Sequence, residues 1–312
     1  MRRRALLAAL ALPAAARAQS WPDRPVTIVL PYQAGGATDT MLRALAGGLQ
    51  ARLGQPVVVV NRDGAAGAVG TLSVMRAAPD GNTLAFIPAV VLSVLPVTRP
   101  ESGLRPDGLV PVCQAFSNAQ AVVVRPDSPH RDLRDLQRAA RAAPGRINYG
   151  SLGTASVPHL AMVEWLTAAG AEMTHVPYRG DGPVMTEVLA GRLEVGAVVL
   201  ASLAGRNDLR VLGIFDQARN PAYPDVPTAI EQGFPVAPAS FGGIMAPRGT
   251  PEERIARVEA ACLEAIRDEG FQSAARRSLQ PERFWDDRAG FARRLEREIA
   301  EKAEVLKRIT LE

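Results

Sequence analysis

Beyond Ala18, the 312-residue sequence has no apolar run long enough to cross a membrane. A transmembrane helix requires roughly 18 uncharged apolar residues, and no later stretch reaches that length. No lipobox cysteine stands near Ala18, so a lipid anchor is not expected. These absences argue against an integral or lipid-anchored membrane protein.

Cysteine is scarce, because only Cys113 and Cys262 occur in the whole chain. An oxidising compartment would permit one disulfide between them. Nothing in the sequence shows that two residues so far apart along the chain meet in space. We therefore expect two separate small core residues.

An excess of positive charge is also absent once the N-terminal segment is set aside. The chain has 36 Lys and Arg residues against 32 Asp and Glu residues, a formal net charge of +4. Four of the arginines lie within Met1–Ala18, so the rest of the chain carries about zero net side-chain charge. We expect no nucleic-acid partner. His, Cys, Asp and Glu do not cluster at metal-ligand spacings, so we expect no metal and no cofactor.

The segment Met1–Ala18 has the three parts of a secretory signal peptide. Met1–Arg4 is cationic, Ala5–Ala16 is a short apolar run, and Ala16-Arg17-Ala18 is a small-x-small cleavage site. We expect cleavage near Ala18 and an exported, soluble chain that begins at Gln19. The arginines leave a twin-arginine route open beside the ordinary secretory route.

Strand-like and helix-like segments alternate along the mature chain, as in an α/β protein with an open, largely parallel sheet. About 294 residues remain after cleavage, which suggests two domains at about 150 residues each. Segments rich in Pro and Gly, Pro96–Pro111 and Pro221–Pro238, are expected to be connections and crossings between the domains. The expected strands include Val57–Val60, Thr83–Ile87, Ala121–Val124, Val195–Leu200 and Val211–Phe215. The expected helices are Thr38–Leu53, Leu133–Ala143, Pro158–Ala169, Pro183–Leu189, Pro251–Arg267 and Arg288–Lys307.

Three loops of small residues each connect a predicted strand to a helix. The first contains Gly35 and Gly36, the second spans Asn61–Gly70, and the third spans Asn148–Ser156. Glycine lets the backbone turn with its N–H groups outward, beside the positive end of a helix dipole. One such loop has an ordinary alternative, a tight connection in which Thr38 or Asp39 caps the helix. Three loops at the carboxyl ends of strands predict a cleft that binds a carboxylate through backbone N–H groups and small hydroxyls.

Enzymatic interpretations have less support. Tyr149 occupies the first Gly position of a G-x-S-x-G elbow around Ser151. His159 lies at a helix start, where a capping or packing role is expected rather than a role as a base. The Gly-rich segment of the second loop departs from G-x-G-x-x-G, so a dinucleotide site is not indicated. We expect a binding protein and not an enzyme.

Several motifs, taken together and in order, resemble one family. They are PYQAGGATD at residues 31–39, NRDGAAG at 61–67, APDGNTL at 78–84, HVPYRG at 175–180, YPDVPT at 223–228, FG at 241–242 and APRGTP at 246–251. The chain is similar to the substrate-binding proteins of tripartite tricarboxylate transporters, also called Bug receptors. The resemblance covers nearly the whole mature chain.

The resemblance implies a periplasmic, two-lobed binding protein of the type II-like fold. Each lobe would be a mainly parallel sheet flanked by helices, with the ligand cleft between the lobes. The first lobe would run from Gln19 to Ala121 and again from Ala239 to Glu312, and the second from Val122 to Pro238. The protein would be a monomer that closes on a small organic carboxylate and contacts membrane permease subunits transiently. A sensor kinase is the alternative partner, because transport and sensing use the same closed surface.

The resemblance also implies which residues bind the ligand. The first loop would hold a carboxylate through backbone amides and ordered water, and the second would line the floor. The third loop and Tyr178 would contribute from the other lobe, and Phe241 would lie near the hinge. The residues implied are Gly35, Gly36, Ala37, Thr38, Asp39, Ala66, Gly67, Ser151, Gly153, Thr154, Ser156, Tyr178 and Phe241.

Two departures from the family pattern bear on the ligand. Val198 stands where family members often have an Asp, which makes an amino-acid ligand less expected. The segment Ile87-Pro88-Ala89-Val90-Val91 replaces a more polar stretch. A wall that includes Pro88 and Ala89 would favour a carboxylate with a hydrophobic body, such as an aromatic or branched acid.

Overall fold

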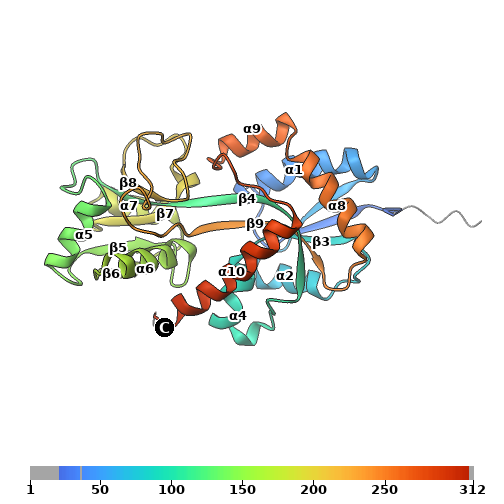
Figure 1. Cartoon of the computed structure of the whole chain (residues 1–312), viewed down its shortest axis with the longest axis horizontal. Coiled ribbons are helices and arrows are strands. Elements are labelled where there is room, and N and C mark those ends of the chain that lie inside the picture. Colours follow the sequence, from blue (N-terminus) through green and yellow to red (C-terminus); the bar gives the residue numbers. More distant parts are fainter. Residues whose placement is uncertain (1–20, 36, 309–312) are drawn as a thin grey trace, which may run out of the picture.

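The computed structural model describes residues 21–35 and 37–308 (Figure 1). The predicted signal peptide, Met1–Ala18, and the predicted binding residue Gly36 lie outside the described residues. Within the described ranges, strands and helices alternate, and the predicted α/β class is confirmed. No helix in these ranges is both long and apolar enough to span a membrane.

The elements follow the predicted order closely. The strands are β1 (Val26–Leu30), β2 (Val57–Asn61), β3 (Thr83–Pro88), β4 (Leu109–Val124), β5 (Asn148–Ser151), β6 (Thr174–Pro177), β7 (Val195–Val199), β8 (Arg210–Phe215) and β9 (Ala239–Pro247). The helices are α1 (Ala37–Leu53), α2 (Ala68–Met75), α3 (Val90–Ser93), α4 (Leu95–Thr98), α5 (Leu133–Ala142), α6 (Val157–Ala169), α7 (Asp181–Leu189), α8 (Glu252–Ala265), α9 (Glu269–Arg277) and α10 (Arg288–Leu306). Short 3-10 turns are η1 (Ala65–Gly67), η2 (Pro100–Ser102) and η3 (Leu200–Leu203).

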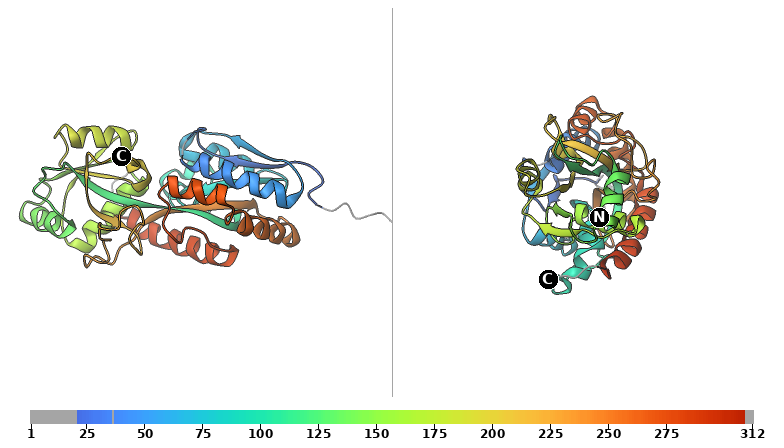
Figure 2. Two further views of the ribbon diagram at one scale, coloured as in Figure 1. Left: turned by 90° about the horizontal axis from the view of Figure 1, so that it is seen from above. Right: turned by 90° about the vertical axis from the view of Figure 1, so that its left-hand side faces the viewer.

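The strands lie in the order β2-β1-β3-β9-β4-β7-β5-β6. Strand β8 lies outside this order and pairs with β4 on the edge opposite to β7. Outer strands pair in parallel, β1 with β2 and β3, and β5 with β6 and β7. The central strand β4 is antiparallel to its neighbours and changes partners along its length. Its residues 109–119 pair with β9, and residues 120–124 pair with β7 and β8. The chain therefore forms two lobes joined by β4 and β9 (Figure 2).

The crossings between the lobes are thus strands rather than the Pro- and Gly-rich segments predicted from the sequence. Strand β9 approaches both neighbours closely, and this approach depends on Gly242 and Gly243. A Cβ atom at Gly242 would lie 2.1 Å from the carbonyl oxygen of Ile87, and one at Gly243 would lie 2.0 Å from that of Cys113. Only glycine fits this pairing without displacing the backbone.

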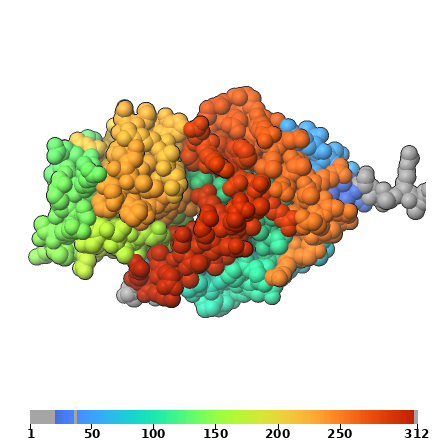
Figure 3. All heavy atoms as spheres, viewed as in Figure 1, coloured from blue at the N-terminus to red at the C-terminus, as the bar shows by residue number. Residues whose placement is uncertain are grey.

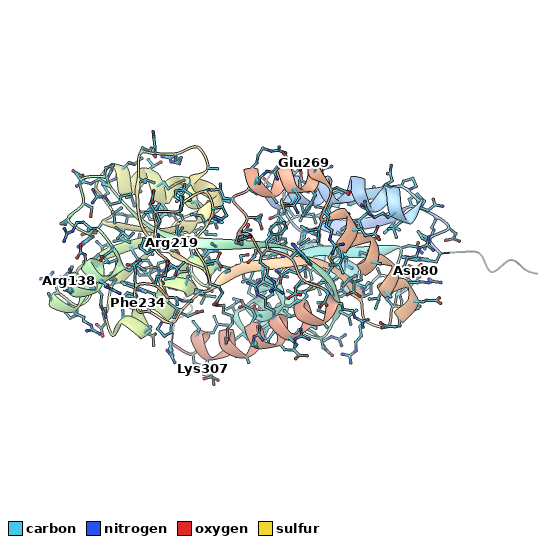
Figure 4. All side chains as sticks on the ribbon, turned by 45° about the horizontal axis from the view of Figure 1, so that its top comes forward. Asp80, Arg138, Arg219, Phe234, Glu269 and Lys307 are labelled. Atoms are coloured by element: carbon cyan, nitrogen blue, oxygen red, sulfur yellow. A yellow bond between two sulfur atoms is a disulfide. The ribbon has the colours of Figure 1, made fainter. Side chains whose placement is uncertain are left out.

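Each lobe has its own core. In the first, α1, α8 and α9 cover one face of the sheet, and α2 and α10 cover the other. In the second, α5 and α6 cover one face and α7 the other. Figure 4 shows α10 running toward the lobe that carries Phe234 and Arg138, with Lys307 at its carboxyl end. Helix α10 therefore contacts both lobes.

The expectation of two separate cysteines is wrong. Cys113 on β4 and Cys262 on α8 form a disulfide, with their Cα atoms 6.5 Å apart and both residues fully buried. The physical reason is topological, because α8 packs on the face of the sheet where Cys113 lies. The 149 residues between them hide this proximity in the sequence.

Candidate ligand-binding site

The first small-residue loop is held in shape by Asp39. The carboxylate is buried and accepts hydrogen bonds from the Gly35 N–H (2.9 Å), the Arg43 guanidinium (2.8 Å) and the Asn61 amide (3.0 Å). Burial opposes its ionisation, but the bonds from Arg43, Gly35 and Asn61 outweigh burial and lower the Asp39 pKa to about 2. Asp39 therefore positions the loop, and its charge is neutralised within the protein.

The second loop has positive φ angles at four consecutive residues. The φ angles are 130° at Gly64, 46° at Ala65, 56° at Ala66 and 99° at Gly67. For alanine this conformation costs roughly 1–2 kcal/mol per residue. In the described part of the chain, the N–H groups of Ala65 and Ala66 have no hydrogen-bond acceptor. Strain of this kind gathers at ligand-binding turns.

The first two loops contact each other and the start of α3. A Cβ atom on Gly67 would lie 3.3 Å from the hydroxyl of Tyr32 and 3.3 Å from a methyl group of Val91. The side chain of Gln33 also donates a hydrogen bond to Asp63, at 3.2 Å. Both loops and α3 therefore lie together at the carboxyl ends of β1, β2 and β3.

The third loop lies in the other lobe, between β5 and α6. Ser151 is fully buried, and its hydroxyl lies 2.7 Å from Nε2 of His175. Ser156 caps α6 by accepting a hydrogen bond from the His159 N–H. The N–H of Tyr178 donates to the carbonyl of Ser151 at 2.8 Å, which ties the end of β6 to this loop. Thr154 is exposed and lines an open groove beside α6.

An apolar cluster brings the two halves of the predicted site together. Val90 of α3 and Ala155 of the third loop both pack against this cluster, which contains Val94, Leu160, Val305 and Leu306. Val91 and Gly67 join α3 to the second loop on its other side. A continuous series of contacts therefore connects all three predicted loops across the two lobes.

The other predicted residues occupy varied positions. Pro88 and Ala89 are buried at the end of β3, and the Ala89 N–H donates to the carbonyl of Phe241 at 2.8 Å. The ring of Phe241 faces α10, where the guanidinium of Arg294 stacks 3.9 Å from its centre. Val198 is fully buried in the core of the second lobe. Ala37 and Thr38 form the first turn of α1.

Sequence reasoning missed several residues that organise the site. Arg43 and Asn61 bond to each other at 2.9 Å and together hold Asp39, and Tyr32 packs beside Gly67. The i,i+4 spacing of Asp39 and Arg43 was a usable signal, since such pairs meet on one helix face. The contact of His175 with Ser151 had no such signal, because it depends on the pairing of β5 with β6.

Two histidines stack beneath the third loop. The rings of His159 and His175 lie 3.8 Å apart at an angle of 11°, and Nδ1 of His159 accepts the Ala155 N–H at 3.0 Å. Burial lowers the pKa of each imidazole from 6.5 to about 4, and for His159 the neighbouring His175 adds to the effect. Both rings are therefore neutral at pH 7 in the folded protein.

This stack predicts acid sensitivity. As the pH falls from 6.5 toward 4, both imidazoles take up protons in the unfolded chain but not in the folded one. The free energy of unfolding is thus greatest above pH 6.5 and falls by about 2 kcal/mol or more toward pH 4. Urea unfolding at several pH values, compared between the wild type and a His159→Gln/His175→Gln variant, measures the effect. Equal pH slopes for the two proteins would contradict it.

These features define a class. Two α/β lobes joined by two strands, with small-residue loops at the facing ends of parallel strands, form a solute-binding protein of the periplasmic type. Residues 41–310 match the family described as tripartite tricarboxylate transporter family receptor. The chain belongs to this family, so the predicted membership is confirmed.

Individual proteins of known sequence or structure support the same family. The chain is 34% identical over 278 residues to protein BugT of Bordetella pertussis, covering 86% of this chain and 84% of BugT. A TctC solute-binding protein from Polaromonas, solved without ligand, is 26% identical with a TM-score of 0.81, covering 93% of this chain and all of that one. An R. palustris protein solved with adipate is 28% identical with a TM-score of 0.77, covering 92% and 97% of the two chains. The predicted two-lobed fold is thereby confirmed.

Proposed function

We propose that this protein is a periplasmic receptor that captures a small carboxylated solute between its lobes and delivers it to a tripartite tricarboxylate-type permease. Membership of the receptor family supports the transport role. The related R. palustris protein was solved with adipate, a dicarboxylate, which supports the ligand class. Cleavage of the signal peptide near Ala18 would release the mature chain into the periplasm.

The proposal rests on main-chain N–H groups that have no hydrogen-bond acceptor in the part of the chain that the structure describes. Nε of Arg43 donates to Asp39 and one of its terminal nitrogens donates to Asn61, so part of this guanidinium already serves the loop. The left-handed turn leaves the N–H groups of Ala65 and Ala66 without acceptors among the described residues. The amino end of the 17-residue helix α1 lies in the adjoining loop. Peptide dipoles of this kind stabilise a carboxylate by charge-assisted hydrogen bonds.

The wall of the site favours a ligand with an apolar body. Val90 is half-buried beside two apolar clusters and keeps accessible surface, whereas Ala89 and Val91 are buried and offer almost none to a ligand. Methylene or aromatic groups that contact such a wall gain about 25 cal/mol per Å² of apolar surface removed from water. We propose a carboxylate with a hydrophobic body, for which adipate, with its methylene chain, is the first compound to test.

Ligand capture would proceed by closure of the lobes. We propose that the first lobe runs from Gln19 to Ala121 and from Ala239 to Glu312, and that the second runs from Val122 to Pro238. The change of partners along β4 near Gln120 and the start of β9 at Ala239 support these boundaries. A ligand that contacts both lobes stabilises the closed state by its higher affinity for that state.

We propose that the protein binds without catalysis and acts as a monomer. The hydroxyl of Ser151, although close to His175, is fully buried, which supports a structural role. Among the described residues, no group of three His, Cys, Asp or Glu side chains is arranged to hold a metal ion. The permease remains the proposed partner, since family membership supports transport and nothing in the site favours a sensor kinase.

Asp39→Ala is expected to weaken binding of the solute by about tenfold or more, equivalent to about 1.4 kcal/mol. The substitution removes the acceptor of the Gly35 N–H and frees Arg43 and Asn61, so the first loop loses its fixed shape. Isothermal titration calorimetry with a panel that includes adipate, malate and benzoate first identifies a ligand. The same titration of the variant then tests the role of the loop.

Glu253→Ala is the control. Glu253 lies in the first turn of α8, outside the predicted loops, is exposed, and has no hydrogen bond or ion pair among the described residues. We expect the affinity of this variant to stay within about twofold of the wild type, since an exposed charge contributes little. Equal affinities for the Asp39→Ala and wild-type proteins would remove the first loop from the site. Failure of every acid in the panel to bind would count against the ligand class.

A further inference from the structure

A second cavity, separate from the small-residue loops, lies where α10 crosses the two joining strands. It has a volume of about 550 Å³ and is bounded by Ser117 of β4, Phe241 of β9, residues 235–239, Glu164 of α6 and the inner face of α10. Figure 3 shows the surface hollowed between α10, in red, and the gold-to-orange segment of the other lobe. Of the predicted binding residues, only Phe241 lines it.

The two cations on the inner wall of this cavity, Lys302 and Arg294, already have hydrogen-bond partners. Nζ of Lys302 lies 2.5 Å from the carboxylate of Glu164. Arg294 donates to Gln114 at 3.2 Å and to Ser117 at 3.3 Å, and its guanidinium stacks on Phe241. Both cations also act through space on Glu298, and Arg294 acts on Asp216 as well, but neither donates a hydrogen bond to these two carboxylates among the described residues.

Two carboxylates of the same cavity have oxygen atoms that accept no hydrogen bond among the described residues. Glu298 of α10 is only 8% exposed, and within the described residues it has no hydrogen bond and no ion pair within 4 Å. Asp216 accepts the Gln217 N–H through Oδ1, whereas its Oδ2 is buried without any partner among the described residues. A buried carboxylate oxygen without a donor, such as Oδ2 of Asp216, is costly, because its lost hydration is not replaced. Glu301, Arg283 and Arg297 complete the charged groups of the wall and are exposed at the rim.

We propose that this cavity is a binding site for a small organic ammonium group, which donates hydrogen bonds to Glu298 and Asp216. An ammonium carries three donors and one positive charge, which matches the acceptors left without partners. The exposed rim arginines have no ion-pair partner among the described residues, so they would receive the carboxylate of a zwitterion if the ammonium belongs to one. Burial raises the pKa of both carboxyls, so binding of the cation should be accompanied by proton release.

Calorimetric titration with butylammonium tests the site without using a carboxylate. We expect saturable binding to the wild type and an affinity at least about tenfold weaker for Glu298→Gln, because a bond between charged groups is lost. Asp216→Asn is expected to weaken binding in the same direction. Glu296→Gln makes the same change on an exposed position of α10 outside the cavity and should leave the affinity unchanged.

Two further measurements identify the ligand class and control for folding of the variant. γ-Aminobutyrate has the same chain length, and tighter binding than butylammonium would assign the ligand to a zwitterion, whereas equal or weaker binding would assign it to a simple amine. The circular dichroism spectrum and melting temperature of Glu298→Gln report whether the variant is folded, and this control does not depend on the proposed receptor function. No heat with wild-type protein, or equal butylammonium affinities for Glu298→Gln and the wild type, would overturn the proposal.

Discussion

Replacement of Cys113 and Cys262 together by alanine is expected to lower the free energy of unfolding by about 4 kcal/mol. The bond joins β4 to α8 across 149 residues, so it removes a large amount of freedom from the unfolded chain. Both cysteines are also fully buried in the core of the first lobe. Guanidinium unfolding of the oxidised wild type and the double variant, followed by circular dichroism, gives the difference.

Reduction supplies the control for this prediction. Dithiothreitol should destabilise the wild type by about the same amount and leave the double variant unchanged. In the described part of the chain no other cysteine exists, so the reagent acts on this bond alone. A double variant as stable as the oxidised wild type would contradict the role assigned to the disulfide.

Lys302→Met is expected to lower the free energy of unfolding by about 3 kcal/mol. Lys302 is 2% exposed and pairs with Glu164 from the other lobe. Burial favours the neutral amine, but Glu298 and Glu164 outweigh burial and raise the Lys302 pKa. Removing the ammonium leaves the carboxylates of Glu298 and Glu164 near each other without this counter-charge.

Lys307→Met is the matched control on the same helix end. Lys307 is exposed, and its partner Glu304 is exposed as well, so the loss should be far smaller than for Lys302→Met. Adding Glu164→Gln to Lys302→Met should recover part of the lost stability, because one uncompensated charge is removed. Equal effects of the Lys302 and Lys307 substitutions would contradict the buried ion pair.

Local sequence patterns predicted most of the regular structure. Helix α1 runs over Ala37–Leu53 where Thr38–Leu53 was expected, and α5 over Leu133–Ala142 where Leu133–Ala143 was expected. Runs of β-branched residues located β2 and β7 in the same way. The pattern of apolar residues within each of these elements indicates a helix or a strand, so they can be predicted without knowing which elements pack against them.

Strands β4 and β9, which join the lobes, were harder to predict. Their polar residues and glycines are required by tertiary contacts and are not typical of a strand sequence. Only the end of β4 was expected, since its middle carries polar residues. In the structure these polar residues have partners. The side-chain amide nitrogen of Gln280 donates to Oδ1 of Asn118, and its side-chain oxygen accepts the Ser117 N–H. Strand β9 contains two adjacent glycines that weaken any strand signal and are required by close approach.

For the candidate site as well, part could be predicted from the sequence and part could not. The three loops were predicted, because glycine and small residues between strand and helix are visible in the sequence. The hydrogen bonds within them were not, since nothing in the sequence shows that Asp39 accepts from Gly35, Arg43 and Asn61 together. Side-chain partners depend on which strands lie next to each other, and no single-sequence pattern reports that arrangement.

The central claim is that main-chain groups from both lobes hold an organic carboxylate. A crystal structure with the acid that binds most tightly in calorimetry tests it most directly. We predict a carboxylate within hydrogen-bond distance of N–H groups in residues 35–39 or 65–67, with further contacts to residues 151–156 or Tyr178. A ligand bound to one lobe only, or located in the cavity beside α10 instead, would contradict the account.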